Sequence, residues 1–317
     1  MLDTSRHFLP LSFLRSQIDA MELVKLNVLH IHISDAQSVP LNVPEFPRIA
    51  SHAAYDPAAT YTAADLAALA QYATQRGVLL LPEIDLPGHA FQFEAAYANL
   101  TANCPSLSGN INNVPLSPVS EIGGFLQRVL NATIGVALSA APEADSSVDG
   151  PDASWVHLGG DEVVDYCWKD DAAVVAWMRA RGWSQDDTGK LYQWFLERGW
   201  EAASVPHRRH AIHWQDAFDA GAVLPEGSVI QVWRGEGSDQ ELASVLASGT
   251  PALLSNSDRW YLNCGDNPTC SYASWQSVYE NEPFPANSTV PVNDRHLLLG
   301  GEAVLFGEYA GWRTAGA

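Results

Sequence analysis

The fold can be worked out from the stretch Ser154-Trp155-Val156-His157-Leu158-Gly159-Gly160-Asp161-Glu162-Val163. A short apolar run ends here in two glycines and two adjacent acids. This pattern is typical of a buried strand that delivers acidic side chains to the rim of a sheet. We interpret Asp161 and Glu162 as a catalytic centre, provided that other strands deliver complementary groups to the same rim. Taken alone, the stretch also fits an ordinary strand end with solvated acids.

Strand-like apolar runs alternate with helical periodicity along the whole chain. The runs lie near residues 1–6, 26–33, 78–85, 155–161, 210–216, 228–234, 251–257 and 296–302. Helical patterns are expected near 11–23, 62–77, 118–138, 170–181, 188–204, 238–248 and 273–280. Several runs are continuously apolar, which indicates strands buried on both faces. The alternation predicts a (β/α)₈ TIM barrel. The alternative, an open doubly wound sheet, usually begins with a glycine-rich phosphate turn that the sequence lacks.

Both ends of the predicted barrel look cut. The first strand starts almost at Met1, and few residues follow the run at 296–302. We therefore expect one barrel domain over 1–317 with a partial first strand and no complete closing helix. The polar, turn-rich stretch 140–153 is expected to be a surface loop.

The charge balance excludes two classes of partner. The chain has 17 lysines and arginines against 37 acids, a formal net charge of −20. Such an acidic surface repels phosphate backbones and anionic lipids. No apolar run approaches the roughly 20 residues that a membrane-spanning helix needs. We expect neither a nucleic-acid partner nor a membrane span.

The cysteines favour an oxidising compartment. Four cysteines permit three complete pairings. We expect disulfides between Cys104 and Cys167 and between Cys264 and Cys270, with four free thiols as the alternative. Asn-x-Ser/Thr sequons begin at Asn99, Asn131 and Asn287. The protein is therefore predicted to follow the secretory pathway to a lysosome, a vacuole or the extracellular space.

Every predicted strand ends in polar or aromatic residues. In chain order they are Arg6, His7, His30, His32, Asp35, Glu83, Asp85, His89, Asp161, Glu162, His213, Trp214, Asp216, Trp233, Arg234, Trp260, Tyr261, Asn263, Glu302, Phe306 and Glu308. TIM barrels place their active sites on this face. Carboxylates mixed with tryptophans suit a neutral sugar, because its C–H faces stack on indoles while polar groups bind its hydroxyls.

Six motifs in this order complete the pattern: Leu2-Asp3-Thr4-Ser5-Arg6-His7-Phe8-Leu9-Pro10, Lys25-Leu26-Asn27-Val28-Leu29-His30-Ile31-His32, Pro87-Gly88-His89, His157-Leu158-Gly159-Gly160-Asp161-Glu162-Val163, Trp260-Tyr261-Leu262-Asn263 and Gly300-Gly301-Glu302-Ala303. Over nearly the whole chain they resemble the catalytic domain of family 20 glycoside hydrolases, the β-N-acetylhexosaminidases. The resemblance implies an exo-acting, retaining hydrolase of terminal N-acetylglucosamine or N-acetylgalactosamine residues. It implies no cofactor and no metal. We expect this chain to lack the accessory domain that usually precedes such a barrel.

The resemblance also implies substrate-assisted catalysis. A retaining glycosidase usually needs two carboxyl groups roughly 5–5.5 Å apart. Asp161 and Glu162 are neighbours, and neighbours on an extended backbone point to opposite sides, which makes them a poor pair of this kind. In the family, the substrate's own acetamido oxygen is the nucleophile. Glu162 would then be the general acid and base, Asp161 would orient the acetamido N–H, and Tyr261 would bind the acetamido oxygen.

Further roles follow from the same resemblance. His89, with Asp35 and Glu83 as its partners, would tune Glu162. The other predicted substrate-binding residues are Arg6, Glu83, Trp214, Trp233, Trp260, Asn263, Phe306 and Glu308. Among them the two walls of the sugar pocket would be Trp214 and Trp233. The outer hydroxyls would be bound by Arg6 and Glu308, which makes the enzyme exo-acting.

Three positions depart from the family pattern. Phe306 stands where tryptophan is common before Gly-Glu, Ile31 stands inside the usual His-Trp-His, and Asn263 replaces a frequent aspartate. These changes affect the stacking wall and the recognition of the 6-position. The sequence leaves the oligomeric state open, with a homodimer, as is common in the family, among the alternatives. We expect an acidic working pH. The natural substrate could be a chitin oligosaccharide, an N-glycan or a glycolipid.

Two other classes of function remain open. A metal-dependent hydrolase could use histidines and an acid from several strands: His30, His32, His89, His157, His213 and Asp216. Against it, His157 is expected deep in the barrel, and the aromatic residues would be unexplained. A carbohydrate-binding protein on a decayed enzyme fold is the other alternative, motivated by Phe306 and the cut ends.

Overall fold

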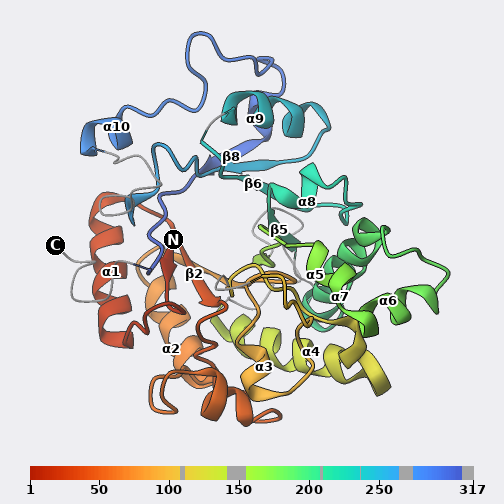
Figure 1. Cartoon of the computed structure of the whole chain (residues 1–317). Coiled ribbons are helices and arrows are strands. Elements are labelled where there is room, and N and C mark those ends of the chain that lie inside the picture. Colours follow the sequence, from red (N-terminus) through yellow and green to blue (C-terminus); the bar gives the residue numbers. More distant parts are fainter. Residues whose placement is uncertain (108–110, 141–154, 208–209, 236, 264–273, 309–317) are drawn as a thin grey trace.

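The computed structural model (Figure 1) describes residues 1–107, 111–140, 155–207, 210–235, 237–263 and 274–308. Its strands form one parallel sheet in sequence order: β1 (Leu2–Asp3), β2 (Val28–Ser34), β3 (Leu79–Ile84), β4 (Trp155–His157), β5 (His210–Trp214), β6 (Val229–Val232), β7 (Ala252–Leu254) and β8 (Leu298–Gly301). After β8 the chain pairs with β1 through a parallel bridge between Leu2 and Leu305. This bridge closes the ring, and the fold is the predicted TIM barrel.

Helices surround the ring of strands in Figure 1. They are α1 (Leu11–Val24), α2 (Ala63–Thr74), α3 (Phe93–Ala96), α4 (Phe125–Ala137), α5 (Tyr166–Asp170), α6 (Ala172–Arg179), α7 (Thr188–His207), α8 (Asp216–Asp219), α9 (Ser238–Ala247) and α10 (Trp275–Tyr279). A π-helical turn, η1 (Ile49–Ala53), and 3₁₀ turns η2 (Pro118–Gly124), η3 (Leu138–Ala140) and η5 (Arg295–Leu297) complete the described elements. No helix among the described residues is both long and apolar enough to span a membrane.

Local sequence signals account for the boundaries of several helices. Thr62 caps α2 through a reciprocal capping box with Asp65. The predicted helix over 118–138 is divided, because Ile122 and Gly123 leave the helical region. The predicted helix over 170–181 is divided at Asp171, whose side chain accepts hydrogen bonds from the first backbone N–H groups of α6.

β4 is shorter than predicted, and this difference matters for the site. The strand ends at His157 instead of continuing to Asp161. Gly159 and Gly160 have φ angles of 62° and 107°, which are open to glycine but rarely adopted by other residues. The apolar run therefore continues beyond the strand, and the chain turns before it reaches the two acids.

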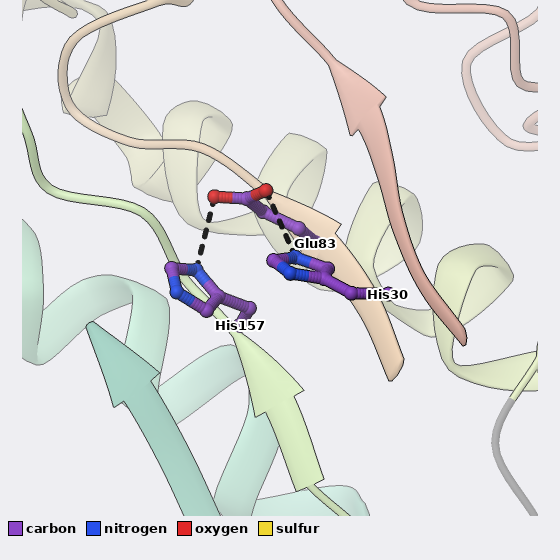
Figure 2. A group of neighbouring side chains, drawn as sticks. All are labelled: His30, Glu83 and His157. Atoms are coloured by element: carbon purple, nitrogen blue, oxygen red, sulfur yellow. Dashed lines mark ion pairs between the residues drawn. The ribbon is translucent and has the colours of Figure 1, made fainter. Parts of the chain in front are cut away.

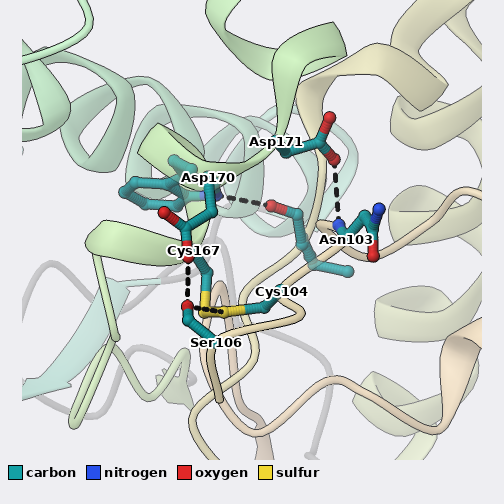
Figure 3. Close-up of a disulfide and its surroundings, with 8 residues drawn as sticks. Asn103, Cys104, Ser106, Cys167, Asp170 and Asp171 are labelled. Atoms are coloured by element: carbon teal, nitrogen blue, oxygen red, sulfur yellow. Dashed lines mark hydrogen bonds between the residues drawn. A yellow bond between two sulfur atoms is a disulfide. The ribbon is translucent and has the colours of Figure 1, made fainter.

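One predicted disulfide lies within the described residues (Figure 3). Cys104 and Cys167 are bonded across a sequence separation of 63 residues. The bond joins the long segment after β3 to α5, and Asn103 N–H adds a hydrogen bond to Asp171 beside it. The predicted pair Cys264–Cys270 lies outside the described residues.

Candidate active site

The carboxyl ends of the strands converge on a pocket of about 400 Å³. All but two of the predicted site residues line it, the exceptions being Glu83 and Trp260. The lining residues are Arg6, His32, Asp35, Asp85, His89, Asp161, Glu162, Trp214, Trp233, Ser257, Tyr261, Asn263, Phe306 and Glu308. The barrel therefore brings together groups from all parts of the chain at the face where such folds carry their active sites.

The two adjacent acids lie on the same side of the pocket, so the expectation that they point to opposite sides was wrong. His89 Nε2 is 3.6 Å from Asp161 Oδ2 and 3.4 Å from Glu162 Oε2. The reason is the backbone, since Glu162 has a φ of 50° and follows two glycines with positive φ. The alternation of side chains along a strand does not apply to this turn.

His89 is held by a buried network of charges. Its Nδ1 is 3.1 Å from Asp35 Oδ1, and Asp35 Oδ2 is 2.8 Å from Arg6 and 2.7 Å from His32 Nε2. Burial opposes a charge on His89, but the carboxylates of Asp35 and Asp161 outweigh it and raise the pKa of His89 well above its usual value. His89 is thus an imidazolium that faces both catalytic candidates.

Glu162 is the most accessible acid of this group, with 44% of its side chain exposed. The amide of Asn113 donates to its backbone oxygen at 2.8 Å and to Oε2 at 3.3 Å. His89, whose Nε2 is 3.4 Å from Glu162 Oε2, lowers the pKa of Glu162, against a smaller opposing effect of burial. Asp161 behaves differently, because burial raises its pKa to about 6 despite the attraction of His89.

Aromatic rings form part of the pocket wall. Trp233 and Tyr261 stack with centroids 6.4 Å apart, and Phe306 meets Tyr261 edge-on at 5.5 Å. Asp216 accepts a hydrogen bond from Trp233 Nε1 at 2.9 Å, which fixes the indole plane. Trp214 is 1% exposed and lies at the base of this wall.

The outer edge of the pocket combines a buried cation with an exposed acid. Arg6 pairs with Asp3 at 3.0 Å and donates to Gln37 at 2.9 Å. Glu308 Oε1 is 3.8 Å from the same guanidinium, and 37% of its side chain is exposed. Asn263 lines the same pocket. Arg6 is thus held by several partners, and the Glu308 carboxylate is the exposed polar group beside it.

Glu83 does not line the pocket, which corrects its predicted place among the substrate-binding residues. It is fully buried, and Figure 2 shows it between His30 and His157. His30 Nε2 is 3.0 Å from Oε2, and His157 Nδ1 is 2.9 Å from Oε1. His32 Nδ1 lies 2.5 Å from Oε2, and Trp214 Nε1 donates to Oε1 at 2.9 Å. Glu83 therefore reaches the pocket only through the side chains that it holds.

Trp260 also lies outside the pocket. Its indole N–H donates to the Val278 carbonyl at 3.0 Å, and its ring packs against Gly301. The neighbouring Tyr261 faces the pocket instead.

Among the residues that the structure describes, three sets of side chains have ligand atoms close enough to hold a cation. They are His30, Glu83 and His157; His32, Glu83 and Asp85; and Asp85, His89 and Asp161. The set predicted for a metal site does not assemble as a whole, because Asp216 pairs with Trp233 and Arg234 instead. His213 is buried, which lowers its pKa to about 3 and keeps it neutral.

The sequence assigns no role in the glycosidase reaction to several residues of the site. Asn113 and Gln37 come from loops with no motif, and only tertiary structure places them beside Glu162 and Arg6. Asp85 and His32 were visible as polar strand ends, but no pattern distinguished them from neighbouring acids and histidines.

Comparison with known proteins agrees with this geometry. The family model described as "Glycosyl hydrolase family 20, catalytic domain" matches residues 1–314. The human β-hexosaminidase subunit beta is 33% identical over 311 residues, which cover 98% of this chain and 52% of that protein. β-Hexosaminidase 3 of Arabidopsis thaliana is 33% identical over 312 residues, covering 98% of this chain and 51% of that protein. The chain thus spans about half the length of these relatives.

Solved structures show the same fold. The β-N-acetylhexosaminidase of Streptomyces coelicolor superposes with a TM-score of 0.70 at 25% identity, covering 97% of this chain and 58% of that one. An exo-β-N-acetylglucosaminidase of Vibrio harveyi, solved with N-acetylglucosamine, has a TM-score of 0.80 at 18% identity, covering 98% of this chain and 50% of that one.

Proposed function

Because the chain belongs to glycosyl hydrolase family 20, we propose that it is an exo-acting, retaining β-N-acetylhexosaminidase. Its substrates are terminal, non-reducing N-acetylglucosamine or N-acetylgalactosamine residues of oligosaccharides or glycoconjugates. The observation that carries the proposal is the placement of Asp161 and Glu162 together beside His89, in a pocket that aromatic rings also line.

The proposed first step needs one general acid and no protein nucleophile. Protonated Glu162 transfers its proton to the glycosidic oxygen as the bond to the anomeric carbon breaks. The acetamido carbonyl oxygen of the same sugar attacks the anomeric carbon and forms a cyclic oxazolinium. The Asp161 carboxylate accepts the acetamido N–H and stabilises the positive charge that develops on the ring. Tyr261 donates to the attacking oxygen and holds it in line.

The second step reverses the role of Glu162. Its carboxylate takes a proton from water, and the water oxygen attacks the anomeric carbon and opens the oxazolinium ring. Two inversions at one carbon give overall retention. The His89 imidazolium, 3.4 Å from Glu162, stabilises the carboxylate form that this step requires.

The shape of the pocket supports action at chain ends. Trp233, Tyr261 and Phe306 supply apolar surface for one face of a sugar, and Arg6 and Glu308 stand at its outer hydroxyls. Phe306 provides a stacking surface without an indole N–H, so it contributes contact area but no hydrogen bond.

The cellular compartment and the oligomeric state are also part of the proposal. The Cys104–Cys167 disulfide favours an oxidising compartment, hence the secretory pathway. The names of several relatives describe them as subunits, and homodimer formation by this chain stays a prediction that a measurement of molecular mass in solution would test.

The experiment compares release of an aryl group from aryl β-N-acetylglucosaminide and from aryl β-glucoside at acid pH. The wild type should hydrolyse only the acetamido substrate. Glu162→Gln should lose at least about 100-fold in kcat, because the amide cannot donate a catalytic proton. Glu45→Gln, at an exposed position, is the matched control and should retain wild-type rates. A folded wild type that binds N-acetylglucosamine without turning over either substrate would favour a carbohydrate-binding protein instead.

A further inference from the structure

Asp85 is a buried acid that the proposed reaction does not yet use. It follows β3 directly, is 1% exposed and lines the pocket. Its Oδ1 accepts the backbone N–H of Gly160 at 3.0 Å. A Cβ at Gly159 would lie 1.7 Å from the same oxygen, so glycine is required there for the Asp85 carboxyl to reach the turn. Asp85 is thus fixed against the backbone that carries Asp161.

Oxygen atoms of the Asp85 and Asp161 carboxyl groups lie within 4.8 Å of each other. Two ionised carboxylates have four acceptor oxygens and no donor, so a hydrogen bond between them needs a proton on one of the two groups. Asp161 Oδ1 is buried, and no N–H or hydroxyl group of the described residues donates to it. The O–H of a neighbouring carboxyl is the donor that this arrangement leaves.

The surroundings decide which of the two acids carries the proton. Burial, together with the negative charge of Asp161, raises the pKa of Asp85 well above its usual value. Asp161 lies 3.6 Å from the His89 imidazolium, which favours its ionised form. The remaining charged groups around the pair are Glu83, His32, Glu162 and Asp216. The proton therefore resides on Asp85.

We propose that Asp85 is a positioning residue that donates a hydrogen bond from its carboxyl O–H to the Asp161 carboxylate. One Asp85 oxygen accepts from Gly160 while the other carries the proton toward Asp161. The rotation of the Asp161 side chain is thereby fixed, and its remaining oxygen faces the pocket to accept the acetamido N–H. This role rests on the proposed function for its catalytic meaning.

The variants Asp85→Asn and Asp85→Ala distinguish the proposed hydrogen-bond donor from an ionised Asp85 and from a residue that only supports the turn. In Asp85→Asn the amide oxygen can accept from Gly160 and the NH₂ group can donate to Asp161. We expect kcat for the acetamido substrate to stay within about tenfold of wild type. Asp85→Ala removes the donor, and kcat should fall about 100-fold with a smaller change in KM. The alkaline limb of kcat/KM against pH should move to higher pH in Asp85→Ala, because Asp161 loses a donor to its ionised form, and should stay in place in Asp85→Asn.

Two results would overturn the proposal. One is a folded Asp85→Asn variant as inactive as Asp85→Ala, which would mean that an ionised Asp85 is needed. The other is an unshifted alkaline limb in Asp85→Ala, which would mean that Asp85 only supports the turn.

A measurement independent of turnover keeps this proposal distinct from the proposed function. The infrared difference spectrum of wild type minus Asp85→Asn at neutral pH should contain the C=O stretch of a protonated carboxyl group. If that band is present and the wild type hydrolyses neither substrate, the proposed function fails while the protonated Asp85 stands. If the band is absent, the Asp85 proposal fails whatever the activity. The spectrum does not need the Asp85→Ala variant, so it tests the proposal even if that variant does not fold.

Discussion

Asp161 and Glu162 are adjacent in sequence, yet their environments move their pKa values in opposite directions. The neighbouring His89 lowers the pKa of Glu162, whereas burial raises that of Asp161 to about 6. The proposed reaction needs the proton on Glu162 and none on Asp161. Between the two pKa values the major form has the proton on Asp161 and none on Glu162. The reactive form, with the proton on Glu162, is a minority that arises from the major form by moving a single proton.

The pH dependence of kcat/KM should therefore be bell-shaped with an acidic maximum. Above about pH 6 both acids are ionised, so Glu162 cannot donate a proton and the rate falls. Below the lowered pKa of Glu162, which lies under its ordinary 4.5, both acids are protonated and Asp161 cannot accept the acetamido N–H. Initial rates with aryl β-N-acetylglucosaminide across the acid and neutral range would check this. A rate that still rises above pH 6 would contradict it.

At single residues the sequence predicts which strand end a side chain occupies better than which way it points. Trp260 and Tyr261 were both predicted to bind substrate, but neighbouring side chains face different ways, and only Tyr261 lines the pocket. Glu83 was also assigned to the pocket, although its position inside β3 places it one layer below. Asn113 was missed because a loop residue has no periodicity to reveal its partner.

At the level of elements, Glu83 connects four neighbouring strands. From β3 it contacts His30 and His32 on β2, His157 on β4 and Trp214 on β5. The histidines outweigh burial and hold the pKa of Glu83 well below its ordinary value. The same carboxylate that neutralises these side chains also fixes the base of the aromatic wall.

Glu83→Gln should destabilise the barrel strongly. The substitution removes the charge that compensates the buried histidines, and breaking a buried ion pair from one side costs about 3–5 kcal/mol. Denaturant unfolding would measure the loss. Glu45→Gln, which makes the same chemical change at an exposed position, is the control and should lie within about 0.5 kcal/mol of wild type. An equal, small effect of both substitutions would show that Glu83 does not hold the strands together.

The order and type of the long elements could be predicted because each apolar run or helical stripe is long enough to show its period. Short elements could not, as with α3 and α8, which have four residues each and cover no full period of contacts. The end of β4 was placed too late because positive φ at Gly159 and Gly160 turns the chain while the sequence stays apolar. That turn is also what brings the two acids to one side.

Over the whole molecule, buried carboxylates and histidines alternate from the floor of the barrel to the pocket. Contacts of 2.5 to 3.4 Å join these side chains in the order Glu302, His30, Glu83, His32, Asp35, His89 and Glu162. Despite burial, neighbouring acids raise the pKa values of His30, His32 and His89, and neighbouring cations lower those of Asp35, Glu83 and Glu302. In the folded chain each charged group of this series therefore lies beside a group of opposite charge.

Stability should fall on both sides of an acidic window. The histidines whose pKa values are raised by folding stabilise the fold fully below their unfolded pKa of about 6.5. This contribution is lost as the pH rises toward their folded pKa values, at up to about 1.4 kcal/mol per pH unit for each proton that the folded chain retains. The carboxyl groups whose pKa values are lowered by folding stabilise the fold above about pH 4, and this contribution is lost as the pH falls. Burial lowers the pKa values of His157 and His213 and keeps both neutral. They lower the stability of the fold only below about pH 6.5, where they are protonated in the unfolded chain.

Denaturant unfolding at constant ionic strength should therefore give a lower free energy of unfolding at pH 8 than at pH 6, by more than about 2 kcal/mol. A free energy that rises over this interval would mean that the buried histidines are neutral in the folded chain.

The central claim is that the substrate's acetamido oxygen, and not a side chain, attacks the anomeric carbon. It is tested most directly by kcat/KM for aryl glucosaminides whose acetyl group carries increasing numbers of fluorine atoms. Fluorine withdraws electrons from the carbonyl oxygen and weakens it as a nucleophile. The account predicts a steep, progressive fall in kcat/KM along the series. A rate that does not depend on the number of fluorine atoms would contradict it and would point to a protein carboxylate as the nucleophile.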